Sequence, residues 1–232
     1  GQKKYEVLSI KADSVVVHGF KVIRSGYASL EDPCAIKVYN KNNVVIQNNV
    51  LDDNFFGIYI QNGRDCLIKN NKIVAYGKEE QQIGNGIHCW KSNNLQVIGN
   101  SISGHRDGIY FEFVTNSVIW RNISANNIRY GLHFMFSNDD AYISNVFKNN
   151  GAGVAGSLVL NKFDTNYWDK YEGYDLNKDG LGDVPYHPLS LFAVLVEKNP
   201  SAMLLLRSFM ITLLDKSEKV LPSITPDNFI DN

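Results

Sequence analysis

Two residues of this chain could together hold a soft metal ion. His133 and Met135 stand two positions apart, so in an extended strand both point to the same face, about 6.6 Å apart along the chain. An imidazole beside a thioether favours copper, and Cu(I) in particular. His88 occupies the equivalent place in another copy of the same pattern, about 9.6 Å away. Because Tyr110 lies between them, one ion shared by both histidines is borderline.

A second motif is a loop rich in oxygen ligands that could hold Ca²⁺. The ligands are Asp175, Asn177, Asp179 and Asp183. Their alternation, with Gly180 at the sharp turn, matches the first half of an EF-hand loop, but Tyr186 stands where that loop has its bidentate Glu. The loop is therefore either a Ca²⁺ site that takes a further ligand from elsewhere or a purely structural turn.

The elements that must position these residues follow from a repeat. Six short runs begin 22, 29, 22, 23 and 22 positions apart, at Ala35, Gly57, Gly86, Gly108, Gly131 and Gly153. Each period also carries a turn with an asparagine: Asn49, Asn71, Asn100, Asn122 and Asn145. Two short strands and a turn in about 22 residues are too few for a helical repeat and fit one coil of a parallel β-helix. We predict an all-β, right-handed parallel β-helix solenoid with a C-terminal helical tail.

Alternation within the runs separates the inside of the solenoid from the outside. The second and fourth positions are apolar throughout, as at Ile109 and Phe111, and are expected to stack in the core. The third and fifth positions point outward and hold an unusual set of side chains: Tyr59, His88, Trp90, Tyr110, Glu112, His133 and Met135. Exposed surface of this kind usually marks a binding site, and a peptide or a carbohydrate would fit it as well as copper.

The recurring asparagines are expected to be structural. A stacked turn can bond its side-chain amide to the next coil, and asparagine also tolerates the left-handed backbone that a corner needs. The three cysteines, Cys34, Cys66 and Cys89, form no metal or disulfide motif and are expected to be packing residues.

Composition argues against several classes of function. The chain has 232 residues, of which 23 are basic and 24 acidic, so we expect no basic surface for nucleic acid. No uncharged run is long enough to span a membrane, and the N-terminus lacks a hydrophobic signal core, which indicates either a cytoplasmic protein or a processed or trimmed chain.

Polysaccharide cleavage on a β-helix would need paired carboxylates. The outward strip offers only Glu112, because Asp107, Asp139 and Asp140 fall at turns, where Asp usually bonds the backbone. We therefore expect no enzymatic activity.

The repeat also predicts the organisation of the chain. The solenoid is expected over residues 1–163, with an extruded loop at 77–82, where one coil is longer than the others. The next asparagine motif after Asn145 comes at Asn161, which is too close for a coil to close, so we expect missing coils near 155/156. An aromatic, Asp/Gly-rich segment at 164–188 is expected to cap the open end.

Residues 189–232 form the predicted helical tail. A helix over about 200–218 is apolar around much of its circumference. It either packs against the solenoid or docks another protein, especially a membrane partner, through Met203, Leu206, Phe209 and Met210.

Three stretches resemble the NosD family, the periplasmic β-helix proteins of nitrous-oxide reductase maturation. They are residues 129–137, the run from Asn100 to Ile109, and the run from Asn166 to Tyr186. The resemblance implies a periplasmic protein that is membrane-associated through an ABC transporter permease and ATPase. It also implies exchange of copper or a sulfur species with a copper chaperone or with nitrous-oxide reductase. The chain departs from the family in being short, since it starts within a coil and loses coils near Ala155.

We thus predict a non-enzymatic periplasmic accessory protein for maturation of the copper centre of nitrous-oxide reductase, with copper and calcium as candidate ions. The alternative is a polysaccharide-binding or polysaccharide-cleaving β-helix, and a third reading is a purely structural solenoid. A genomic neighbourhood with a transporter ATPase, a permease and a copper reductase would decide for the first.

Overall fold

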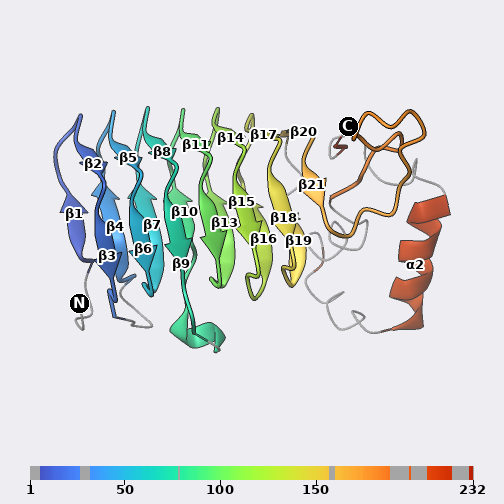
Figure 1. Cartoon of the computed structure of the whole chain (residues 1–232), viewed down its shortest axis with the longest axis horizontal. Helices are drawn as coiled ribbons and strands as arrows, with labels where there is room; N and C mark the ends of the chain where they lie inside the picture. The colour runs from blue at the N-terminus through green and yellow to red at the C-terminus, as the bar shows by residue number, and fades with distance from the viewer. Residues whose placement is uncertain are drawn as a thin grey trace.

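The computed structural model describes residues 6–26, 32–77, 79–156, 160–188, 199, 208–220 and 230–231. Within them the chain winds into a right-handed parallel β-helix built from three seven-stranded parallel sheets (Figure 1). Each coil contributes one strand to each sheet, so neighbouring strands in a sheet come from successive coils. The predicted fold is confirmed.

The first sheet contains β1 (Leu8–Ile10), β4 (Cys34–Tyr39), β7 (Phe56–Gln61), β10 (Ile87–Trp90), β13 (Asp107–Glu112), β16 (Tyr130–Met135) and β19 (Ala152–Gly156). The second contains β2 (Val16–His18), β5 (Val45–Gln47), β8 (Leu67–Lys69), β11 (Gln96–Ile98), β14 (Val118–Trp120), β17 (Ala141–Ile143) and β20 (Lys162–Asp164). The third contains β3 (Lys21–Ile23), β6 (Val50–Asp52), β9 (Lys72–Val74), β12 (Ser101–Ser103), β15 (Ile123–Ala125), β18 (Val146–Lys148) and β21 (Tyr167–Trp168).

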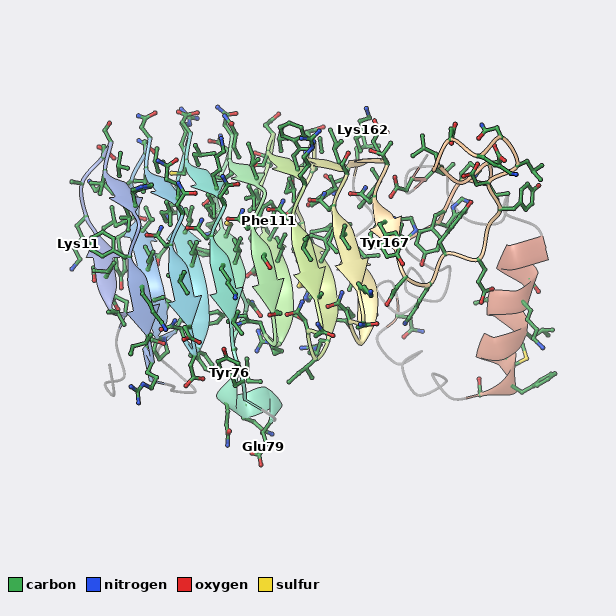
Figure 2. The ribbon with its side chains drawn as sticks, in the orientation of Figure 1. Lys11, Tyr76, Glu79, Phe111, Lys162 and Tyr167 are labelled. Carbon is green, nitrogen blue, oxygen red and sulfur yellow. The ribbon has the colours of Figure 1, made fainter. Side chains whose placement is uncertain are left out.

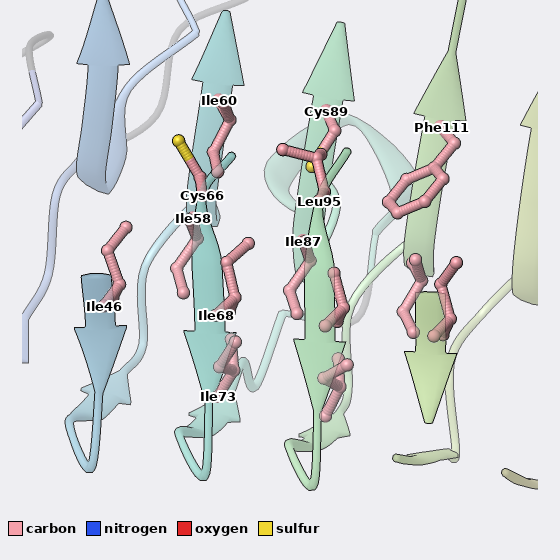
Figure 3. Packing of buried hydrophobic residues seen from close by; sticks show 14 of the residues in the cluster. Ile46, Ile58, Ile60, Cys66, Ile68, Ile73, Ile87, Cys89, Leu95 and Phe111 are labelled. Carbon is pink, nitrogen blue, oxygen red and sulfur yellow. The ribbon is translucent and has the colours of Figure 1, made fainter. Parts of the chain in front are cut away.

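The core is a set of stacked columns, as the alternation predicts. Ile58, Ile87, Ile109 and Leu132 pair in register across β7, β10, β13 and β16, and all four are fully buried. Figure 3 shows the stacked isoleucines of neighbouring coils and Phe111 among them. Cys66 and Cys89 lie in this core, whereas Cys34 belongs to a separate cluster with Phe56 and Tyr59. All three cysteines are buried, as expected of packing residues.

The asparagine ladder runs along one corner of the solenoid. Its members are Asn49, Asn71, Asn100, Asn122, Asn145 and Asn166, and each side-chain amide nitrogen donates to the side-chain oxygen of the next at 2.9 to 3.0 Å. One detail differs from the prediction: the ladder asparagines do not carry the left-handed backbone. The residue before each of them does, as at Arg121 (φ 53°) before Asn122.

The ladder also corrects the expectation of missing coils near 155/156. Asn166, not Asn161, is the ladder partner of Asn145, and it follows after 21 residues. Asn161 belongs to another corner, where its side-chain oxygen accepts the N–H of Asp140. Strand β19 runs through Ala155 and Gly156 in register with β16, and β20 follows it with the usual spacing. The reason to expect missing residues is therefore removed.

The long coil extrudes its extra residues between β9 and β10, as predicted. A single 3₁₀ turn, η1 (Glu80–Gln82), lies in this loop, and Tyr76 and Glu79 stand away from the solenoid (Figure 2). Tyr76 is 65% exposed. Because the loop adds no strand, it leaves the register between coils undisturbed.

Aromatic residues close the C-terminal end, as predicted. Trp168 stacks on Phe147 with ring centroids 4.5 Å apart and contacts the ring of Tyr186. Asp231, near the end of the chain, accepts a hydrogen bond from the Trp168 indole Nε1–H at 2.5 Å and one from the Asn166 backbone N–H at 3.3 Å. Asp231, 65 residues after Asn166, thus continues the asparagine ladder by one further residue, and we call this contact the Asp231 rung.

The tail contains one described helix, α2 (Phe209–Val220), which Figure 1 shows beyond the capped end. The predicted helix over about 200–218 overlaps it from Phe209 onward; residues 200–207, with Met203 and Leu206, lie outside the described part. Phe209 and Met210 are 78% and 63% exposed. In the described portion of the chain, no helix is both long and apolar enough to cross a membrane.

Asp140 gives a testable pH dependence of stability. Its side chain accepts the Ser117 backbone N–H at 2.8 Å, and burial raises its pKa to about 7 from a usual value of 3.8. The folded state therefore holds a proton that the unfolded chain releases, so the stability of the parent falls as pH rises from about 4 to about 7. We expect Asp140→Asn to be more stable than the parent by up to about 4 kcal/mol at pH 8.5, and nearly equal to it at about pH 4.

Denaturant unfolding of both proteins at the two pH values measures this difference. A parent that matches Asp140→Asn at the higher pH would show that its carboxylate is well solvated or paired when charged.

Candidate functional site

Four rings from successive coils stack on the outer face of the first sheet. We call this set the ring column: Tyr59, His88, Tyr110 and His133. The parallel register places them side by side on β7, β10, β13 and β16. Their centroids are 4.5, 4.7 and 4.6 Å apart in that order. Most of this column is half-buried, and Tyr59 is buried, so the predicted open patch is in fact a packed stack.

The fifth strand positions form a second outer column beside the ring column. Trp90, Glu112 and Met135 pair across β10, β13 and β16 and are half-buried. The Tyr110 hydroxyl donates to the Met135 sulfur at 3.3 Å and so joins the two columns. Burial raises the pKa of Tyr110 to about 12, which keeps the phenol protonated and able to donate.

A buried carboxylate lies against His133. Asp107 is 1% exposed, and its Oδ2 lies 3.6 Å from Nδ1 of His133 and 3.5 Å from Nε of Arg106. Gly108 holds this start of β13 close to the next coil, because a Cβ there would meet the Gly131 carbonyl oxygen at 2.7 Å. The expectation that Asp107 bonds the backbone at a turn is thus replaced by an ion-pair role.

Arg106 connects this carboxylate to the other histidine. Its Nη2 donates to Oδ1 of Asn85 at 3.0 Å, and Nδ2 of Asn85 lies 3.4 Å from Nδ1 of His88. Burial, with the positive charge of Arg106 as a second cause, lowers the pKa of His88 to about 3. His88 is therefore neutral at physiological pH.

Orphaned polar atoms gather at this place. Among the described residues, four buried atoms there have no hydrogen-bond partner: Nε2 of His88, Nε of Arg106, Oδ1 of Asp107 and Nδ1 of His133. Two of them, Nε of Arg106 and Nδ1 of His133, face Oδ2 of Asp107 at 3.5 and 3.6 Å, which leaves Nε2 of His88 and Oδ1 of Asp107 outside these contacts. Buried polar atoms are nearly always paired, so unpaired atoms at one place favour a functional site over a structural face.

The structure thus brings together most of the outward residues predicted from the sequence. His88 and His133 stand on opposite sides of the Tyr110 ring, which separates them. Sequence reasoning missed Asn85, Arg106 and Asp107 as site residues. The available signal was their position, since Asn85 and Asp107 directly precede the repeat glycines of neighbouring coils and Arg106 directly precedes Asp107.

The oxygen-rich loop lies elsewhere, in the capping segment. Its side chains accept hydrogen bonds from its own backbone: Gly180 N–H donates to Asp175 at 3.0 Å, and Leu181 N–H donates to Asp179 at 2.8 Å. Over the part of the chain that the structure describes, no three His, Cys, Asp or Glu side chains gather into a group that could hold a metal. The geometry is that of a self-bonded turn, and Ca²⁺ there stays a prediction.

The corner beside the second outer column carries two unusual phenylalanines. Phe113 and Phe136 have φ values of 53° and 49°, a left-handed backbone that bulky residues rarely adopt. Their rings stack 5.2 Å apart, and they are 43% and 54% exposed. Exposed aromatic rings held at a backbone cost favour a contact role.

Comparison with known proteins identifies the architecture. A family model described as "right handed beta helix region" matches residues 8–166. No curated protein matches the chain. Among solved structures, the chain is similar to the crystal structure of PfbA, a surface adhesin of Streptococcus pneumoniae, with 17% identity and a TM-score of 0.44. The match covers 70% of this chain and 48% of that one, so the chain spans about half the length of that structure.

Proposed function

Since this chain belongs to the right-handed β-helix family, we propose that it is a non-enzymatic accessory protein that carries a soft cargo, copper, on the outer face of its first sheet. The resemblance to NosD supports the process, which is maturation of the copper centre of nitrous-oxide reductase. It also supports a periplasmic location and work beside an ABC transporter.

The observation that carries the proposal is the contact between Asp107 and His133. A histidine that binds a metal through one nitrogen usually directs the other to a carboxylate or carbonyl, and Asp107 lies 3.6 Å from Nδ1 of His133. The thioether of Met135 stands two residues along the same strand. These residues fit a copper ion held by His133 Nε2 and Met135 Sδ.

The same geometry disfavours catalysis. Glu112 is the single carboxylate in the two outer columns, Asp107 is engaged with Arg106 and His133, and the raised pKa of Tyr110, about 12, makes it a poorer base than an ordinary phenol. An acid and a base poised at neutral pH are what glycan cleavage requires.

Copper binding tests the proposal. We expect His133→Ala and Met135→Ala each to weaken Cu(I) affinity by more than about 100-fold, since loss of a ligand costs more than loss of its orienting partner. Competition with a chromophoric Cu(I) chelator measures this. The control is Gln61→Ala, an outward residue of β7 three coils away, which should leave affinity unchanged. Equal affinity in all four proteins would refute the copper site.

A second candidate function is polysaccharide binding, favoured by the exposed Phe113–Phe136 stack beside Lys91 and Trp90. Sugar rings pack on aromatic faces, and a cation would favour an acidic sugar. Glycan-array binding that is lost in Phe136→Asn, together with absent copper uptake, would favour this function over the first.

The partner proposal concerns α2. Phe209, Met210 and Leu213 are exposed apolar residues of this helix and suit docking to a transporter permease. Deleting the whole tail would also remove the Asp231 rung, so a substitution is the cleaner test. We expect Met210→Asp to abolish co-purification with the permease without moving the thermal transition, whereas Lys216→Asp, on the same helix, retains the partner. Retained co-purification of Met210→Asp would count against docking through α2.

A further inference from the structure

We propose that Asp107 and Asn85 hold the two imidazoles of the ring column in opposite tautomers, so that His133 has an unprotonated Nε2 and His88 keeps its proton on the buried Nε2. Asp107 is then a positioning residue, and His133 is the sole imidazole ligand of the site. The statement that His133 is the sole imidazole ligand of copper rests on the proposed function. The assignment of the two tautomers does not.

Asp107 determines the proton of His133. A carboxylate is an acceptor only, and Oδ2 of Asp107 lies 3.6 Å from Nδ1 of His133. Arg106, whose Nε lies 3.5 Å from the same oxygen, keeps the carboxyl group in place. The neutral imidazole gains most when its one proton sits on Nδ1, facing the carboxylate. Nε2 then carries the lone pair that a metal requires.

Asn85 determines the proton of His88 in the opposite sense. An asparagine amide can be placed either way round, and the guanidinium of Arg106 fixes it here, because Nη2 donates to Oδ1 at 3.0 Å. The NH₂ group must then face Nδ1 of His88 at 3.4 Å. Nδ1 becomes the acceptor, and the single proton of the neutral ring sits on Nε2. That nitrogen can donate but cannot bind a metal.

The polar network around Arg106 therefore gives His88 and His133 different tautomers. Both branches start at Arg106, which contacts Asp107 on one side and Asn85 on the other. The chain then offers a soft ion one imidazole and one thioether. Two protein ligands bind an ion weakly enough for it to be transferred. The remaining ligands must come from the protein that delivers the ion or from the protein that receives it.

The experiment is ¹⁵N-detected NMR of the metal-free protein near pH 8, above the usual histidine pKa of about 6.5. The chain has five histidines, and His88→Gln and His133→Gln assign the two signals. We expect the protonated nitrogen to be Nδ1 in His133 and Nε2 in His88. The same tautomer in both rings would overturn the proposal.

Two near-isosteric variants test the two causes separately. Asp107→Leu removes the acceptor that faces His133 and should abolish the preference of its proton for Nδ1, with Cu(I) affinity lowered about 10- to 100-fold. Asn85→Asp presents only acceptors to His88 and should move its proton to Nδ1. Unchanged tautomers in either variant would contradict the assigned cause, and circular dichroism checks that each variant keeps its fold.

The two proposals fail separately. Opposite tautomers in a parent that takes up no Cu(I) would support the polar network and refute the copper function. Copper uptake by a parent with equal tautomers would support the function and overturn this inference.

Discussion

Replacing Asn122 with alanine is expected to lower the free energy of unfolding by about 4 kcal/mol. Asn122 is fully buried, and its side-chain NH₂ donates to the Val97 carbonyl at 2.8 Å and to Asn145 at 3.0 Å. Its side-chain oxygen accepts two hydrogen bonds from Asn100. Alanine leaves donors and acceptors on both neighbouring coils buried without partners, and each such group costs about 1–3 kcal/mol.

Urea unfolding followed by circular dichroism measures this loss. The matched control is Gln96→Ala, which removes an exposed amide from β11 and should change stability by no more than about 0.5 kcal/mol. If Asn122→Ala lost no more than the control, the ladder would be a consequence of the stacked turns rather than a source of their stability.

Replacing Phe111 with alanine is expected to lower the free energy of unfolding by about 3–5 kcal/mol. Phe111 is fully buried between the paired residues Cys89 and Phe134 of the adjoining coils. A solenoid coil contacts only its neighbours, so a cavity in one coil weakens the stacking on both sides.

Phe113 supplies the control for this prediction. Phe113 lies two residues after Phe111, but its side chain is 43% exposed and its backbone is in the left-handed region. Phe113→Ala removes a half-exposed stack on Phe136 and should therefore cost less, at about 0.5–1.5 kcal/mol. Equal losses in the two variants would mean that the assignment of inside and outside at β13 is wrong.

Both effects bear on the candidate site. His88, Tyr110 and His133 owe their spacing to the register that the core columns and the ladder impose on successive coils. A variant that loosens one coil should therefore disturb the ring column even where it touches none of its residues.

The sequence by itself determined the coil and its two faces. A period near 22 residues fixes the length of a coil, and strict alternation places Ile109 and Phe111 inside and Tyr110 and Glu112 outside, because neighbouring side chains in a strand point to opposite faces. The ladder asparagines were predictable for the same reason, since an amide repeated at one corner can bond its own copy in the next coil. These features are local and repeated, so a one-dimensional pattern carries them.

Only the tertiary structure decided which residues meet across coils and at the ends. Asn161 and Asn166 both follow Asn145 as possible ladder asparagines, but they lie at different corners of the solenoid. Taking Asn161 as the ladder residue made the last coil look too short and so predicted missing residues. The rung at Asp231 comes from 65 residues away, a distance that no repeat encodes. Asn85 and Arg106 lie in ordinary connecting segments, and Asp107 is the first residue of β13. They become a network with His88 and His133 because stacking aligns three coils, and side-chain contacts between coils depend on rotamers and burial rather than on spacing in the chain.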